Sequence, residues 1–146
     1  MTRRKAKTEP GASPLVLVVD DFADNREMYA LYLRHVGYRV EEAEDGVQAL
    51  EKAFARIPDL IVMDLSLPSL DGWEATRRLK ADARTRRVPV IALTGHAFEG
   101  QSKAAAKAGC DAFVTKPCEP KTLETTIRRV LSEAAPSRER KEKRGS

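Results

Sequence analysis

The chain contains four short, mostly apolar runs, each of four or five residues. They are Leu15–Val19, Leu60–Met63, Val90–Leu93 and Ala112–Thr115. Such runs are too short for a core helix, and their β-branched residues suit strands that are buried on both faces. A further strand is expected at Arg39–Ala43, where charged side chains indicate a position nearer a sheet edge. Five short strands are therefore predicted.

Apolar residues between these strands recur at the spacing of a helix face. The predicted helices lie at about residues 28–36, 47–53, 73–81, 98–108 and 123–134. Met28, Tyr29, Tyr32, Leu33 and Val36 share one face of the first helix, and Val47, Leu50 and Ala53 mark the second. Gly37 stands where a helix end favours a residue with positive φ. Pro136 lies just past the last predicted helix.

Strands and helices thus alternate as five successive strand–helix units. Helical crossovers of this length demand parallel strands and right-handed connections. The predicted fold is α/β, an open five-stranded parallel sheet with helices on both faces. Such sheets bind ligands outside the carboxyl ends of their strands, where the strand order reverses. Those strand ends are therefore where functional residues are expected.

The net charge of +4 is concentrated at the ends of the chain. Residues 1–13 and 136–146 each carry a net charge of +3, which leaves −2 for residues 14–135. Charged ends that contain Pro and Gly are typically solvated and disordered. We therefore expect one domain at 14–135 between two disordered basic tails. A weak contact of the tails with nucleic acid is less favoured, and no direct nucleic-acid binding is expected.

The sequence shows neither a membrane span nor a secretory signal. No apolar run approaches the roughly 20 residues that cross a bilayer, and the N-terminal segment lacks an apolar core. Cys110 and Cys118 do not have the spacing of a zinc site or a redox pair, so two ordinary thiols in a reducing compartment are expected. A cytoplasmic protein without membrane contact is predicted.

Polar residues that can perform chemistry follow four of the predicted strands. Asp20 and Asp21 follow the first strand, and Asp64 follows the third. Thr94 follows the fourth strand and Lys116 the fifth. Parallel strands place these ends at one edge, so residues almost 100 positions apart should meet in one pocket.

These residue types suit a phosphoryl-transfer site. Clustered carboxylates repel one another unless a cation joins them, and Mg²⁺ takes carboxylates, water and phosphate oxygens as ligands. A carboxylate can also attack phosphorus to give an aspartyl phosphate. A lysine and a metal can stabilise the charge of the transferring group, while a hydroxyl can hydrogen-bond the phosphate. Singly, these residues could be a helix cap, a turn aspartate, a strand threonine and a surface lysine; their coincidence at one edge favours function.

The motifs VVDD at 18–21, MDLSLPSLDG at 63–72, IALTG at 91–95 and FVTKP at 113–117 resemble the CheY-like receiver domain of two-component signalling. The resemblance covers about residues 14–134 and implies the strand order 2-1-3-4-5. It implies that Asp64 accepts a phosphoryl group. It further implies that Mg²⁺ is held by Asp20, Asp21, the Asp64 side chain and the Ser66 carbonyl.

The resemblance also assigns roles around this centre. Thr94 corresponds to the switch hydroxyl, and Lys116 to the lysine that pairs with the phosphate. Phe113 corresponds to a rotating aromatic switch, although a plain core aromatic is the alternative. The Lys116–Pro117 bond is expected to be cis, and Gly95 to leave room for a phosphodonor.

Three further positions lie outside this set. His96, two residues after Thr94, could tune the lifetime of the phosphate or be a solvated loop residue. His35 is expected to be a surface residue near a helix C-terminus rather than a catalyst. Trp73 is expected to cover part of the core beneath the Asp64 loop.

The resemblance implies a stand-alone response regulator of the DivK type rather than an enzyme acting on other molecules. Its expected partners are a histidine kinase or histidine phosphotransfer protein and an unknown downstream protein. A monomer or a phosphorylation-dependent dimer is expected. An aspartate-nucleophile phosphohydrolase is the alternative, but such enzymes of the haloacid-dehalogenase type carry an acid/base Asp where this chain has Ser66. A degenerate receiver that acts only as a scaffold is disfavoured because every acceptor-site residue type is present.

Overall fold

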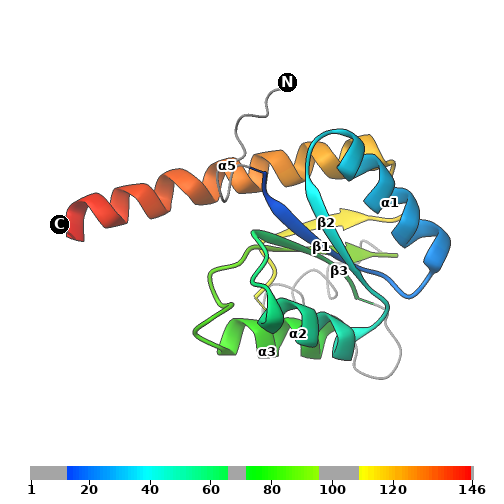
Figure 1. Cartoon of the computed structure of the whole chain (residues 1–146), viewed down its shortest axis with the longest axis horizontal. Coiled ribbons are helices and arrows are strands. Elements are labelled where there is room, and N and C mark those ends of the chain that lie inside the picture. Colours follow the sequence, from blue (N-terminus) through cyan, green and yellow to red (C-terminus); the bar gives the residue numbers. More distant parts are fainter. Residues whose placement is uncertain (1–12, 66–71, 96–108, 146) are drawn as a thin grey trace.

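The computed structural model describes residues 13–65, 72–95 and 109–145, with side chains in the last range as far as Ala134. Its elements alternate as predicted (Figure 1). The strands are β1 Leu15–Val19, β2 Arg39–Ala43, β3 Leu60–Asp64, β4 Val90–Thr94 and β5 Ala112–Thr115. The helices are α1 Ala23–His35, α2 Gly46–Ala55, α3 Gly72–Ala81 and α5 Pro120–Gly145. The helix predicted at 98–108 lies outside the described residues.

The five strands form one parallel sheet in the order β2-β1-β3-β4-β5, which confirms the predicted fold class. The apolar runs of β1 and β3 are buried along their whole length, because both of their faces are covered. The charged strand β2 lies at an edge, also as predicted.

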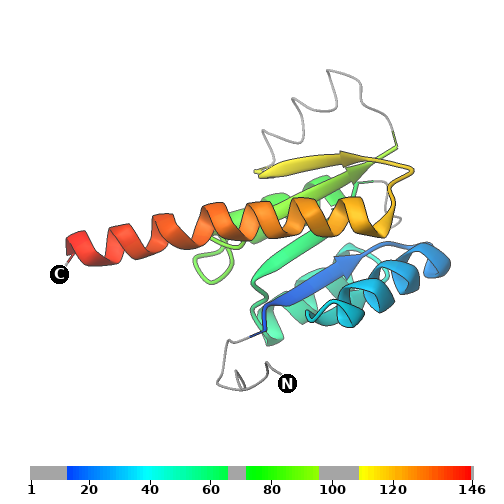
Figure 2. The same cartoon turned by 90° about the horizontal axis from the view of Figure 1, so that it is seen from above.

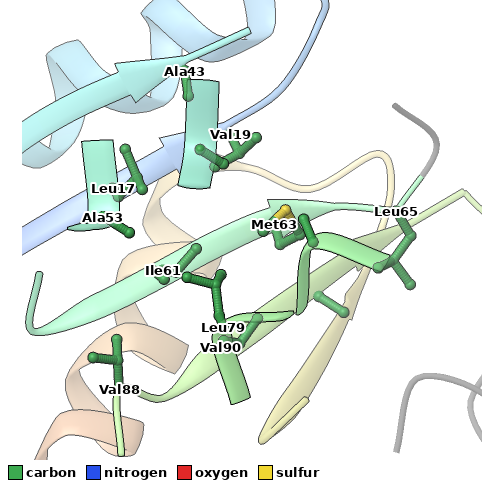
Figure 3. Packing of buried hydrophobic residues seen from close by; sticks show 13 residues of the cluster. Leu17, Val19, Ala43, Ala53, Ile61, Met63, Leu65, Leu79, Val88 and Val90 are labelled. Atoms are coloured by element: carbon green, nitrogen blue, oxygen red, sulfur yellow. The ribbon is translucent and has the colours of Figure 1, made fainter. Parts of the chain in front are cut away.

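Two hydrophobic layers hold the helices against the sheet. Figure 1 shows α1 and α5 on one face and α2 and α3 on the other. On the α2/α3 face, side chains such as Leu17, Ile61 and Met63 pack against Ala53 and Leu79, as Figure 3 shows. The opposite face is built in the same way. Its members include Val16, Val18, Val62, Tyr29, Leu33, Leu123 and Ile127.

The predicted face of the first helix was correct in position but partly wrong in membership, and one apolar residue of the second helix is also exposed. Met28, Val36 and Val47 are 41%, 42% and 47% exposed. The face of α1 that meets the sheet is centred on Tyr29 and Leu33, with Met28 about 100° away from Tyr29 around the helix, and Val36 lies beyond the helix end. In α2 small alanines form the contact instead of Val47, because they allow the helix to approach the sheet closely.

The end of α5 also differs from the prediction. The helix continues through Pro136 to Gly145, where a disordered tail at 136–146 was expected (Figure 2). Proline removes its own N–H from the helix ladder and its ring crowds the carbonyl four residues earlier, but the Arg, Lys and Glu residues that follow are good helix formers. Within the described residues, no helix combines the length and apolar character needed to cross a membrane.

Candidate functional site

The parallel register brings the predicted site residues to one edge of the sheet. Val19 is paired with Met63, so Asp20 and Asp64 leave β1 and β3 side by side. Asp64 is paired with Leu93, and Thr94 with Thr115, the residue before Lys116. The ends of neighbouring strands therefore place carboxylates, a hydroxyl and a lysine side by side at this edge of the sheet.

The three aspartates form one cluster. Oxygen atoms from Asp20, Asp21 and Asp64 all lie within 4.8 Å of one another. Asp20 and Asp64 are 0% and 1% exposed, whereas Asp21 faces solvent. Like charges at this spacing disfavour one another, and burial adds a desolvation cost. The cluster is therefore suited to a cation.

Lys116 supplies positive charge beside this cluster. Its Nζ donates a hydrogen bond to Asp64 Oδ2 at 3.1 Å and lies 3.7 Å from Asp20 Oδ2, beyond hydrogen-bonding range. The Lys116 main-chain N–H donates to the Thr94 carbonyl at 2.8 Å, which fixes the root of the side chain to β4. One lysine thus faces two buried carboxylates and compensates them only in part.

Asp20 shows most clearly the effect of this incomplete charge compensation. Its Oδ1 accepts a hydrogen bond from the Phe22 N–H at 2.9 Å, but its buried Oδ2 has no hydrogen-bond partner among the described residues. Burial raises the pKa of Asp20 above its usual value, an effect that the Phe22 N–H and Lys116 oppose and that Asp64 and Asp21 reinforce. An unsatisfied, desolvated oxygen beside two further carboxylates fits a hard divalent cation such as Mg²⁺.

Two structural contributors to the site were not identified from the sequence. A Cβ on Gly72 would lie 2.3 Å from the Asp64 carbonyl oxygen, so the start of α3 can pass over Asp64 only as glycine. Arg26 donates from Nη1 to the Asp20 carbonyl at 3.0 Å and from Nε to Glu42 at 3.1 Å. The only sequence signal was the glycine in the motif at 63–72; nothing indicated Arg26.

The remaining predicted positions fall into three groups. Thr94 is half-buried at the edge, Gly95 is exposed with open space where a Cβ would stand, and the Lys116–Pro117 bond is cis as expected. Phe113 is 41% exposed, which excludes the plain core aromatic, because alternation along β5 buries Ala112 and Val114 instead. Trp73 packs on the core as predicted. Ser66 and His96 lie outside the described residues.

Comparisons with known proteins agree on one family. The family model of the response regulator receiver domain matches residues 16–128. The phosphate regulon transcriptional regulatory protein PhoB of Pseudomonas aeruginosa is 40% identical over 121 residues, which cover 83% of this chain and 53% of PhoB. The polar-differentiation response regulator DivK of Brucella ovis is 34% identical over 119 residues, which cover 82% of this chain and 97% of DivK. The chain therefore spans about half the length of PhoB and nearly all of DivK.

One of the similar solved structures contains a metal ion. The receiver domain of the sensor histidine kinase PA1611 from Pseudomonas aeruginosa PAO1 is 37% identical and superposes with a TM-score of 0.76, covering 82% of this chain and 98% of that one. That domain has a magnesium ion coordinated in its active-site cleft.

Proposed function

Because this chain belongs to the response regulator receiver domain family of two-component signalling proteins, we propose that it accepts a phosphoryl group on Asp64 from a phosphohistidine protein in a Mg²⁺-dependent reaction. The observation that carries the proposal is the placement of Asp64. This carboxylate is buried at the end of β3, 3.1 Å from the Lys116 ammonium and within 4.8 Å of two further carboxylates.

Each residue of the cluster has a chemical task in this proposal. An Asp64 oxygen forms the new bond to phosphorus while the P–N bond of the donor phosphohistidine breaks, which leaves a neutral histidine once a proton is gained. The Lys116 ammonium stabilises the negative charge on the transferred group. The Thr94 hydroxyl hydrogen-bonds the phosphoryl group after transfer. Gly95 leaves space for the donor.

Asp20, Asp21 and Asp64 are the residues proposed to hold Mg²⁺, with the Ser66 carbonyl as a further proposed ligand. The fit rests on the unpartnered Asp20 Oδ2 and on a donor set made of oxygens alone. When bound, Mg²⁺ neutralises charge on the phosphoryl oxygens. Coordination in the PA1611 receiver domain supports the assignment.

The signal is proposed to leave the domain through protein–protein contact. Thr94 and Phe113 are the proposed switch pair, and the exposure of Phe113 leaves its ring free of core packing. The proposed partners are a histidine kinase or phosphotransfer protein as the donor and a downstream protein as the target. The proposal also includes any dimer that forms on phosphorylation. So is a cytoplasmic location, which the two free cysteines support.

The proposal is tested by incubating the chain with acetyl phosphate and Mg²⁺ and measuring its intact mass. The wild-type chain should gain one phosphoryl group, and Asp64→Asn should gain none. Asp45→Asn is the matched control, because Asp45 caps α2 by accepting the Gln48 N–H and Asn caps equally well. Equal labelling of Asp64→Asn and the control would refute the proposal.

A further inference from the structure

Tyr29 on α1 connects the helix to the chain segment that carries Lys116. The Tyr29 hydroxyl donates a hydrogen bond to the Cys118 carbonyl at 3.0 Å, across 89 positions of sequence. The tyrosine is 2% exposed, and its ring lies in the same hydrophobic cluster against which Cys118 packs. The contact therefore joins two elements on one face of the sheet, directly beside the candidate site.

This hydrogen bond holds a short segment that has few other supports. On one side, the Lys116 N–H is bound to Thr94 at the end of the sheet, and on the other, α5 begins at Pro120. Between them, the Glu119 carbonyl accepts the Leu123 N–H at 3.1 Å as α5 begins, and the Tyr29 hydroxyl supplies the hydrogen bond that ties the segment to α1. Lys116 therefore stands between two fixed points, Thr94 and Cys118.

We infer that Tyr29 is a positioning residue for phosphoryl transfer, acting through the Cys118 carbonyl on the backbone that presents Lys116. The inference rests on the proposed function, since it assigns the purpose of the contact to the reaction at Asp64. Tyr29 touches neither reactant. Its role is to keep the Lys116 ammonium within reach of the phosphoryl group, where small displacements are costly.

The Tyr29 hydroxyl is suited to be a hydrogen-bond donor that stays protonated. Burial is the main reason that the pKa of Tyr29 is raised to about 12, with the negative charges of Cys118, Asp20 and Asp64 adding to it. The hydroxyl therefore remains a proton donor throughout the physiological range. A partly buried carbonyl that loses its donor is left less well satisfied, so removing one oxygen atom should release the segment around Cys118.

The test compares Tyr29→Phe with Tyr38→Phe in the full chain. Tyr38 is the matched control, because its hydroxyl also donates a tertiary hydrogen bond, to Glu124 Oε2 at 3.1 Å, but on the α5 side away from the aspartates. Tyr29→Phe should slow phosphorylation by acetyl phosphate about tenfold and weaken beryllofluoride binding. Its Mg²⁺ affinity should not change, because the aspartates are intact. Tyr38→Phe should leave all three values at the wild-type level.

A double-mutant comparison separates positioning from general stability. If Tyr29 acts through Lys116, Tyr29→Phe should slow phosphorylation no further in a Lys116→Met background. A full, additive loss there, or a wild-type rate in Tyr29→Phe alone, would overturn the inference. Replacing Tyr29 by 4-aminophenylalanine keeps an N–H donor and should restore the rate; failure to restore it in a folded protein would also count against the inference.

Hydrogen exchange makes the result independent of phosphorylation. In the unphosphorylated chain, Tyr29→Phe should speed exchange of the Lys116 amide, which is bonded to Thr94, and not that of the Leu65 amide, which is bonded to Leu93. The wild-type chain could fail to accept a phosphoryl group while the Lys116 amide still exchanges faster in Tyr29→Phe. That result would refute the proposed function but leave the anchoring contact supported. If the wild-type chain is phosphorylated but Tyr29→Phe leaves exchange of the Lys116 amide unaltered, only the positioning role is rejected.

Discussion

Asp20 and Glu124 are both buried carboxylates, but their surroundings are opposite. Glu124, 8% exposed on α5, accepts hydrogen bonds from Arg128 Nη2 at 2.6 Å and from the Tyr38 hydroxyl at 3.1 Å. The Arg128 guanidinium is the main reason that its pKa is lowered. Asp20 is fully buried, has one oxygen with no hydrogen-bond partner among the described residues, and has a pKa that burial raises.

The difference separates a structural carboxylate from a ligand-binding one. Around Glu124 the protein itself satisfies the charge, so the group joins α5 to Tyr38 at the start of β2. Around Asp20 it leaves the charge partly unsatisfied, which costs stability unless a cation arrives. Such a local cost is typical of functional sites.

The first prediction concerns metal affinity. Asp20→Ala and Asp21→Ala together should weaken Mg²⁺ binding by at least about 100-fold, whereas Glu124→Gln should leave it unchanged. Calorimetric titration with Mg²⁺ measures both, and quenching of Trp73 fluorescence gives a second readout near the site. Undiminished affinity in the double variant would remove the aspartates from the proposed metal site.

The second prediction concerns the sign of a stability change. In EDTA, Asp20→Asn should raise the free energy of unfolding by about 1–2 kcal/mol, because it removes a poorly compensated buried charge. Mg²⁺ at 100 times its dissociation constant should stabilise the wild-type chain by about 2.7 kcal/mol and the variant much less, so the order reverses. Urea unfolding with and without Mg²⁺ measures this, and a variant that is less stable in both conditions contradicts it.

The third prediction concerns Glu124, whose carboxylate is likewise replaced by the corresponding amide. Glu124→Gln should lower the free energy of unfolding by about 1–2 kcal/mol, since it weakens hydrogen bonds made to a charged group. Mg²⁺ should not alter this loss. A stabilising effect of Glu124→Gln in urea unfolding would show that Glu124 is strained as Asp20 is.

The fourth prediction concerns pH. The pKa of Glu124 is lowered from 4.5, so its stabilising contribution is present above pH 4.5 and is lost as the pH falls through the lower, folded value. The pKa of Asp20 is raised from 3.8, so in EDTA its destabilising contribution fades as the pH falls through the raised value toward 3.8. The stability differences between wild type and Glu124→Gln or Asp20→Asn should therefore have opposite pH slopes. Parallel slopes would contradict the assigned shifts.

The fifth prediction adds an exposed carboxylate as a reference. Glu133 pairs with Arg129 at 3.4 Å, and both side chains are more than half exposed. Solvent screens such pairs, so Glu133→Gln should change the free energy of unfolding by less than about 0.5 kcal/mol. A loss as large as that of Glu124→Gln would contradict this expectation, because burial would then not determine how much such an ion pair contributes.

The sequence predicted the strands and the strand-end cluster well for a physical reason. Short apolar runs and the residues that end them are local features, and a parallel sheet converts them into one edge. Helix faces were less predictable, because Ala49 and Ala53, rather than the larger Val47, make the contact of α2. A local pattern cannot show which side of a helix meets the sheet most closely.

The positioning contacts could not be predicted because they depend on tertiary structure. Tyr29 was expected on the apolar face of its helix, but its hydroxyl reaches Cys118 only after α1 and the end of β5 are packed together. Arg26 and Gly72 are similar cases, since each meets a main-chain carbonyl of an aspartate from another element. The continuation of α5 through Pro136 also ran against a local rule, because proline normally ends a helix.

The most direct test of the account is to locate the phosphoryl group. The chain would be treated with acetyl phosphate and Mg²⁺, reduced with borohydride, which converts an aspartyl phosphate into homoserine, and mapped by tandem mass spectrometry. The account predicts homoserine at position 64 alone, with Asp20, Asp21 and Glu124 unmodified. Homoserine at Asp20 or Asp21, or its absence from position 64 in protein shown to bind Mg²⁺, would contradict it.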